Sequence, residues 1–139
     1  MPKESTAPDA PRIFRVTIQV SDLEAAVAFY SKLLGVKGRR IHGARSYFDC
    51  GAVILAVLDP TGGGSRARPT PDYVYFSVKD LDNVHARARR LRCLSAEDVH
   101  GKSGGDIVAR PWGERSFYAR DPFGNLLCFV DAKTVFRGR

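Results

Sequence analysis

Alternating apolar and polar positions open two similar segments of this chain. The apolar positions are Val16, Ile18 and Val20 in the first segment and Val74, Phe76 and Val78 in the second. A period of two is typical of a strand with one buried face. Residues 15–24 also align with residues 73–82 without a gap. The chain therefore contains a repeated unit that begins with a strand.

Each predicted strand runs into a segment with a helical period. The apolar stripe consists of Leu23, Ala26, Val27, Tyr30, Leu33 and Leu34 in the first helix and of Leu81, Val84, Ala88 and Leu91 in the second. Such stripes predict amphipathic helices that pack on a sheet. Ser21 and Glu24 form a capping-box pattern at the start of the first helix, Gly35 marks its end, and Asp80 is the expected cap of the second.

Shorter strand signals follow both helices, so that the unit becomes βαβββ, twice. They lie at residues 36–42, 46–50 and 53–58 in the first half and at 116–120 and 126–130 in the second. We expect an α+β fold in which two βαβββ modules form a curved mixed sheet with a concave cleft and carry the helices on the outer face.

The predicted organisation is a single domain, residues 12–139, after a flexible tail, residues 1–11. Its modules are residues 12–58 and 72–131, and the linker 59–71 is rich in glycine and proline. The glycine-containing segment 97–107 is expected to be a mobile loop that can cover a ligand.

Composition narrows the class of protein further. The chain of 139 residues has no apolar run long enough for a membrane span, and its three cysteines form no CxxC pair. These features favour a soluble cytoplasmic protein with reduced thiols. The net charge of +7 disfavours a cationic ligand. Nucleic acid is not expected as a partner, because the arginine-rich second helix has no aromatic stacking platform beside it.

The segment Pro111–Val130 resembles the final hairpin of the vicinal-oxygen-chelate superfamily, which includes glyoxalases, bleomycin-resistance proteins and extradiol dioxygenases. The duplicated module fits the same resemblance, and Pro-Trp-Gly-x-Arg at residues 111–115 is most similar to the metal-free bleomycin-resistance-like branch. Residues 121–125, Asp-Pro-Phe-Gly-Asn, are interpreted as a hairpin turn without chemistry.

The resemblance implies four positions at which catalytic members hold a metal ion. In this chain they fall on Arg15, Leu55, Tyr73 and Cys128. Only Cys128 is an ordinary ligand, and a guanidinium at Arg15 would repel a divalent cation. We therefore expect no metal, no cofactor and no catalytic residue.

Strand alternation and the resemblance together predict a ligand site on the concave face. Its members are Arg15, Thr17, Tyr73, Tyr75, Trp112, Ser116, Tyr118 and Cys128. One cation, several phenols and an indole suit an aromatic ligand that is neutral or anionic. Tyr73, Tyr75 and Trp112 also have an ordinary interpretation as packing residues, and Cys128 as a small buried hydrophobic residue. Asp49 or Glu114 is an alternative partner for Arg15. The direction of Arg115 stays open, since strand parity does not favour the concave face.

The sequence therefore favours a metal-independent small-molecule binding protein. The alternative is a metal-dependent lyase, dioxygenase or thiol-transferase of the same superfamily with atypical ligands. Bleomycin itself is disfavoured because that drug is cationic and this chain is basic. The resemblance also implies a homodimer.

Overall fold

The first module of the computed structural model, which describes residues 9–139, is a four-stranded sheet with one helix. It consists of β1 (Arg15–Gln19), α1 (Leu23–Leu34), β2 (Arg39–Ile41), β3 (Arg45–Cys50) and β4 (Val53–Leu58). The strand order is β1-β4-β3-β2, with β1 parallel to β4. Most of the predicted tail, residues 1–8, lies outside the described residues.

The second module repeats this plan and contains an inserted hairpin. After the short turn η1 (Thr61–Gly63) it consists of β5 (Val74–Val78), α2 (Leu81–Arg90), β6 (Asp98–Val99), β7 (Lys102–Ser103), β8 (Val108–Ala109), β9 (Arg115–Arg120), β10 (Leu126–Asp131) and η2 (Ala132–Thr134). The sheet order is β5-β10-β9-β8, and β6 pairs only with β7. The β6–β7 hairpin thus lies in the segment that was expected to be a loop.

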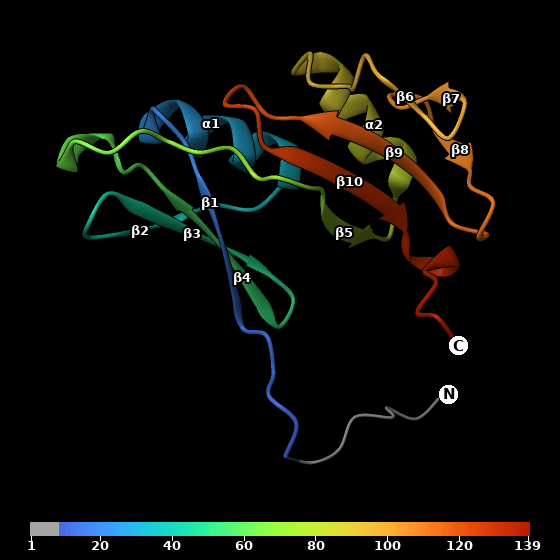
Figure 1. The fold of residues 1–139 in the computed structure, drawn as a ribbon, viewed down its shortest axis with the longest axis horizontal. Helices are drawn as coiled ribbons and strands as arrows, with labels where there is room; N and C mark the ends of the chain where they lie inside the picture. The colour runs from blue at the N-terminus through green and yellow to red at the C-terminus, as the bar shows by residue number, and fades with distance from the viewer. Residues whose placement is uncertain (1–8) are drawn as a thin grey trace.

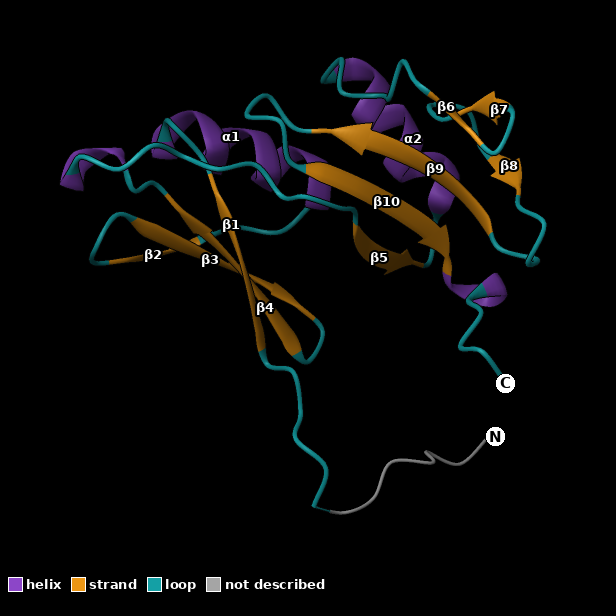
Figure 2. Ribbon diagram, viewed as in Figure 1, coloured by secondary structure: helices purple, strands orange, loops and turns teal. Residues whose placement is uncertain are grey.

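The α+β fold class is confirmed, and the two sheets remain separate. The helices α1 and α2 contact each other, while the two sheets diverge below them (Figures 1 and 2). Strands β1 and β5 each lie at the edge of their own sheet. The concave surface expected of one continuous sheet is therefore divided into two faces, one on each sheet. We call each of these faces a half-site. No helix among the described residues has the length and apolar character needed to cross a membrane.

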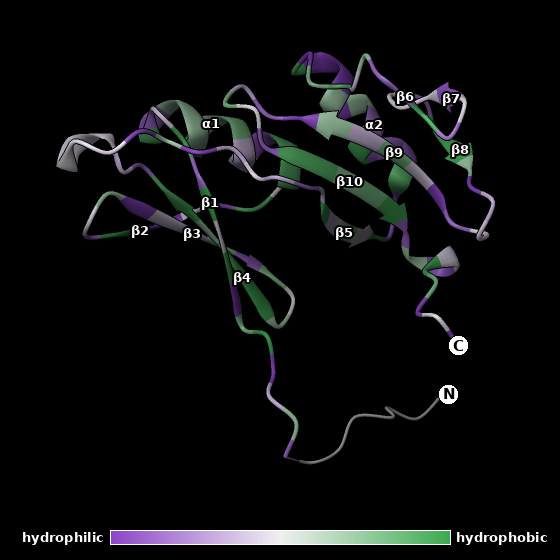
Figure 3. Cartoon of the chain, in the orientation of Figure 1, coloured by the Kyte–Doolittle hydropathy of each residue, from purple (hydrophilic) through white to green (hydrophobic). Residues whose placement is uncertain are grey.

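The core lies between the sheets and the helices. Ile18 and Val20 are buried, as the alternation predicts, and so are Phe117 and Phe129 of the second sheet. The predominantly apolar β10 runs through the middle of that sheet (Figure 3). One face of each sheet is thus committed to packing, and only the opposite face remains for a ligand.

The start of α1 differs from its prediction. The cap is Asp22, whose carboxylate accepts a hydrogen bond from the backbone N–H of Ala25 at 3.1 Å, and Ser21 does not fill this role. Asp80 caps α2 in the same way through Asn83 N–H. Asp22 and Asp80 are equivalent in the repeat, so the duplication itself identified the correct cap. The end of α1 at Gly35, with a φ of 70°, is as predicted.

Residues 121–125 form a turn that also joins the two modules. The buried carboxylate of Asp121 accepts hydrogen bonds from Tyr30 Oη of α1 at 2.6 Å and from Asn125 Nδ2 at 2.8 Å. The same Asn125 amide donates to the carbonyl of Gln19 at 2.8 Å. Burial, followed by the charge of Asp121, holds the pKa of Tyr30 well above its usual range. Residues 121–125 therefore form the hairpin turn and also a polar connection between α1, the end of β1 and the final hairpin.

Candidate functional site

Most of the predicted ligand residues gather on the concave face of the second sheet. Strand register places Tyr75, Cys128 and Tyr118 in one row across β5, β10 and β9. Tyr75 is exposed, whereas Cys128 and Tyr118 are buried. The ring of Tyr73 meets that of Tyr118 edge-on, with centroids 4.7 Å apart. Ser116 lies one row further along β9, also buried.

An aromatic hollow of about 440 Å³ opens beside this row. Its walls are formed by Tyr75, Phe76, Ser77, Trp112, Glu114, Val130, Val135, Phe136 and Arg137. Trp112 is fixed in place because its Nε1 donates to Glu114 Oε1 at 2.7 Å. The other oxygen of Glu114 accepts from the backbone N–H of Phe136 at 2.9 Å. Aromatic walls with a few oriented polar groups are typical of a site for a small organic molecule.

The predicted residues Arg15 and Thr17 do not join this group. They lie on β1, in the other sheet, and both are exposed. The Arg15 guanidinium stacks over the rings of Phe14 and Tyr47, at 4.9 and 5.7 Å from their centroids.

Neither expected carboxylate pairs with Arg15. Asp49 forms an ion pair with Arg39, and Glu114 binds Trp112 and a backbone amide. Arg15 is therefore a cation on an exposed half-site, and it does not occupy the centre of a closed cavity.

Leu55 was assigned to the wrong face. It is buried in the core, whereas Ala56 lies opposite Thr17 as Cys128 lies opposite Tyr75. Ala56 is thus the equivalent of Cys128. The prediction aligned the two turn glycines, but the turn before β4 is shorter than the turn before β10. A shift of one residue exchanges the two faces of a strand.

The four positions that could hold a metal ion are consequently Arg15, Ala56, Tyr73 and Cys128. Burial raises the pKa of the Cys128 thiol to about 12, so it is a neutral thiol near pH 7 and not a thiolate ligand. Within residues 9–139, no three His, Cys, Asp or Glu side chains come close enough to share a cation. His85 and His100 have other contacts, with the Gly105 carbonyl and the Trp112 ring. These residues do not fit a divalent metal.

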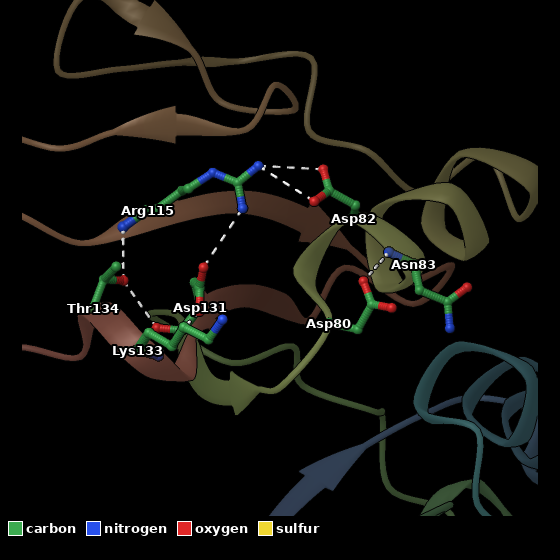
Figure 4. Close-up of polar contacts among 7 residues, drawn as sticks. All are labelled: Asp80, Asp82, Asn83, Arg115, Asp131, Lys133 and Thr134. Atoms are coloured by element: carbon green, nitrogen blue, oxygen red, sulfur yellow. Dashed lines mark hydrogen bonds and ion pairs between the residues drawn. The ribbon is translucent and has the colours of Figure 1, made fainter.

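Arg115 points away from the concave face, as strand parity suggests. Its guanidinium forms ion pairs with Asp82 of α2 at 3.2 Å and with Asp131 at 3.6 Å (Figure 4). Its backbone N–H donates to Thr134 Oγ1 at 3.0 Å. Arg115 thus connects the start of α2 to the end of β10 and is not part of the ligand site.

The sequence interpretation missed one residue of this face, Arg110. It lies between β8 and Trp112 and is only 4% exposed. Its guanidinium carbon is 4.9 Å from the centroid of the Tyr118 ring, on the concave side of β9. The one sequence feature that could have identified Arg110 is its position directly before Pro-Trp-Gly, residues 111–113. Its burial depends on tertiary packing and not on local pattern.

The β6–β7 hairpin covers part of the same face. Val99 packs against the cluster formed by Tyr118, Cys128 and Val130. At the tip, the ring of His100 meets that of Trp112 edge-on, with centroids 4.9 Å apart. The segment expected to close over a ligand therefore lies over the candidate site.

A larger cavity of about 790 Å³ lies between the two modules, at the β5 edge. Its lining is mostly apolar and includes Ile13, Val16, Ile54, Val74 and Phe76. Two of these residues, Val16 and Val74, alternate with the concave-face positions of their strands. The cavity adjoins the aromatic hollow, because Tyr75, Phe76 and Ser77 of β5 line both, and it follows from the separation of the sheets.

Comparisons with known proteins agree on the family. Residues 12–129 match the family model described as Glyoxalase/Bleomycin resistance protein/Dioxygenase superfamily. No curated protein sequence gives a significant match.

Solved structures resemble the chain over most of its length. A lactoylglutathione lyase from Agrobacterium tumefaciens shares 25% identity, with a TM-score of 0.63, over 92% of this chain and 97% of its own. The oxidase ChaP-H2 also shares 25% identity, with a TM-score of 0.69, over 87% and 93%. A glyoxalase/bleomycin resistance protein from Albidiferax ferrireducens T118 shares 23%, with a TM-score of 0.69, over 86% and 98%.

Proposed function

This chain belongs to the glyoxalase/bleomycin resistance protein/dioxygenase superfamily, and from this premise we propose that it binds a small organic molecule without the help of a metal ion. The observation that carries the proposal is the composition of the concave face of the second sheet. That face offers aromatic rings, hydroxyl groups and a neutral thiol, and these groups favour recognition of an organic ligand over coordination of a cation.

The proposed ligand is partly aromatic and neutral or anionic. The contact residues would be Tyr73, Tyr75, Trp112, Ser116, Tyr118 and Cys128. Flat rings stack well on such walls. The net charge of +7 repels a cationic ligand at long range and attracts an anionic one.

We further propose a homodimer. The edges of β1 and β5 that are unpaired in the described chain, and the nearby exposed Ile13 and Phe14, leave backbone and apolar groups open to a second copy. Arg15 and Thr17 would then join the aromatic half-site only from across the interface. A solution mass equal to that of one chain would remove this part of the proposal.

The alternative remains a metal-dependent lyase, dioxygenase or thiol-transferase with atypical ligands. Two similar structures, at 25% identity, bear the names of a lyase and an oxidase. The alternative requires a metal bound by groups that the four inward positions do not supply.

Two measurements separate these functions. Elemental analysis of protein purified without chelator should find less than stoichiometric metal. A thermal-shift panel of aromatic carboxylates, neutral aromatics and arylalkylamines, which are cationic near pH 7, should show stabilisation by the first two classes and none by the amines. Stoichiometric metal would favour the enzyme, and stabilisation by amines alone would reject the proposed ligand class.

A further inference from the structure

The buried guanidinium of Arg110 is an unusual feature of this face. Its Nε donates to Ser116 Oγ and its Nη2 to the Ser116 carbonyl, both at 3.0 Å. Its third nitrogen, Nη1, is buried and has no hydrogen-bond partner among residues 9–139. A buried donor without a partner costs about 1–3 kcal/mol, and more on a charged group. The fold therefore retains a donor that its own described residues do not satisfy.

The charge of Arg110 is also uncompensated. No carboxylate among residues 9–139 lies within ion-pair distance of it, and Glu114 is engaged by Trp112 and by the Phe136 amide. A guanidinium does not lose its proton near neutrality. The groups that surround it, Ser116, Tyr118 and Cys128, are neutral at this pH. The stacked ring of Tyr118 offsets part of the desolvation, but it provides no anion.

We propose that Arg110 receives the carboxylate of the ligand, while the aromatic part of the same molecule occupies the neighbouring hollow. This inference rests on the proposed function and specifies its ligand class as aromatic carboxylates. The row Tyr75, Cys128, Tyr118 leads across the sheet from the wall of the hollow to the guanidinium. Trp112, two residues after Arg110, lines the same hollow.

The β6–β7 hairpin must move when such a ligand binds. Arg110 and Tyr118 are 4% and 2% exposed, and Val99 packs against the cluster of Tyr118, Cys128 and Val130. The hairpin has two residues in each strand, and an exposed ion pair between Glu97 and Arg120 lies at its base. Beyond β7 the backbone N–H of Tyr118 donates to the Gly104 carbonyl at 2.7 Å, so we expect only residues 98–103 to be displaced. Val99 packs on the cluster whose Tyr118 ring lies under the cation, so we expect it to compete with the ligand.

The test compares three probes that differ only in their polar group: 3-phenylpropionate, 3-phenylpropionamide and 3-phenylpropylamine. Trp112 is the single tryptophan of the chain and lines the hollow, so its fluorescence reports on binding. The wild-type protein should bind the acid about tenfold more tightly than the amide, because only the acid brings a negative charge to the buried guanidinium. It should not bind the amine.

Variants assign this preference to one side chain. Arg110→Met should abolish the tenfold preference by weakening the acid far more than the amide, and Arg110→Lys should retain part of it. The matched control Arg115→Met removes an arginine on the opposite face and should change neither affinity. Val99→Ala should tighten binding of both acid and amide.

The outcomes separate the inference from the function on which it depends. Equal binding of acid and amide by the wild-type protein would overturn the role of Arg110 and leave the proposed function standing. A preference abolished by Arg15→Met but kept in Arg110→Met would also overturn it. Absence of binding by every aromatic carboxylate would overturn both. If Arg110→Met does not fold, the wild-type preference and Arg110→Lys still decide the question.

Discussion

At the scale of single residues, the described part of the chain, residues 9–139, contains two contrasting buried charged side chains. The carboxylate of Asp121 is fully engaged, with a phenol, two backbone N–H groups and an amide. The guanidinium of Arg110 keeps one donor without a partner. Buried polar groups are normally satisfied. Asp121 is therefore explained by the fold, and Arg110 is better explained by a ligand.

Removal of the Tyr30 hydroxyl tests the connection between the modules. Tyr30→Phe deprives the buried Asp121 carboxylate of a 2.6 Å hydrogen bond and should lower the free energy of unfolding by about 1–3 kcal/mol. The control Tyr47→Phe alters the same chemical group on the half-buried β3 and should cost less than half as much. Urea unfolding measures both variants. Equal losses in the free energy of unfolding would mean that the Tyr30–Asp121 hydrogen bond contributes no more to stability than the hydroxyl of Tyr47.

Alkaline pH should weaken the fold. Burial raises the pKa of the Cys93 thiol to about 11 and that of the Cys128 thiol to about 12, from an ordinary value of 9. The unfolded chain therefore releases these protons from about pH 9 upward while the folded chain retains them. Stability is fully present below pH 9 and is lost as the pH rises, by up to about 1.4 kcal/mol per pH unit for each thiol.

Urea unfolding between pH 8 and pH 10.5 measures this loss. The double variant Cys93→Ala, Cys128→Ala should show a smaller slope, and the remainder should come from Cys50 and from tyrosines whose pKa burial also raises, Tyr30 and Tyr118 among them. An identical slope in the double variant would show that the two thiols are not protected in the folded state.

At the scale of elements, the sequence predicted what short-range periodicity determines. The strand and helix of each module, the end of α1 at Gly35 and the β9–β10 hairpin follow from local pattern and turn chemistry. The predicted cap at Ser21 and the predicted face of Leu55 were wrong, because each differs from the structure by one residue, a shift that the hydrophobic pattern tolerates. The β6–β7 hairpin was not predicted, since its two-residue strands leave no period to detect.

The cap of α1 provides a prediction at this scale. Asp22→Ala removes the acceptor for Ala25 N–H and should lower the free energy of unfolding by about 1 kcal/mol. Ser21→Ala, the neighbouring change at the position favoured by the capping box, should have little effect. Chemical denaturation of both variants measures the difference. A larger loss in Ser21→Ala would restore the original prediction.

At the scale of the whole molecule, the separation of the sheets divides the predicted site. Tyr73, Tyr75 and Cys128 meet on one sheet as the alternation predicts, but Arg15 and Thr17 lie on the other. The alternation of residues along a strand predicts on which side of its own sheet each side chain lies. It gives no information on how two sheets are placed relative to each other. For the same reason the sequence pointed to Arg15 as the cation of the ligand site, whereas we propose Arg110. Only tertiary packing brings Arg110 onto the face of the second sheet.

The proposed dimer gives the prediction for this scale. Ile13 is 74% exposed, so Ile13→Asp should not affect a single folded chain, but it should dissociate a dimer in which a second copy covers this segment. Light scattering after size-exclusion chromatography should give the mass of two chains for the wild-type protein and one for the variant. Ala96→Asp, at an exposed site outside the β1 edge, should remain dimeric. A dimeric Ile13→Asp would place the interface elsewhere.

The most direct test of metal-independent recognition is a calorimetric titration of 3-phenylpropionate into the chelator-treated protein, repeated with added Zn²⁺, Mn²⁺ or Fe²⁺. The donor set of the concave face predicts the same affinity in every titration, because Arg110, Tyr118 and the aromatic walls require no cation. Binding that appears only with a divalent ion, or consumption of the ligand once the ion is present, would contradict the account.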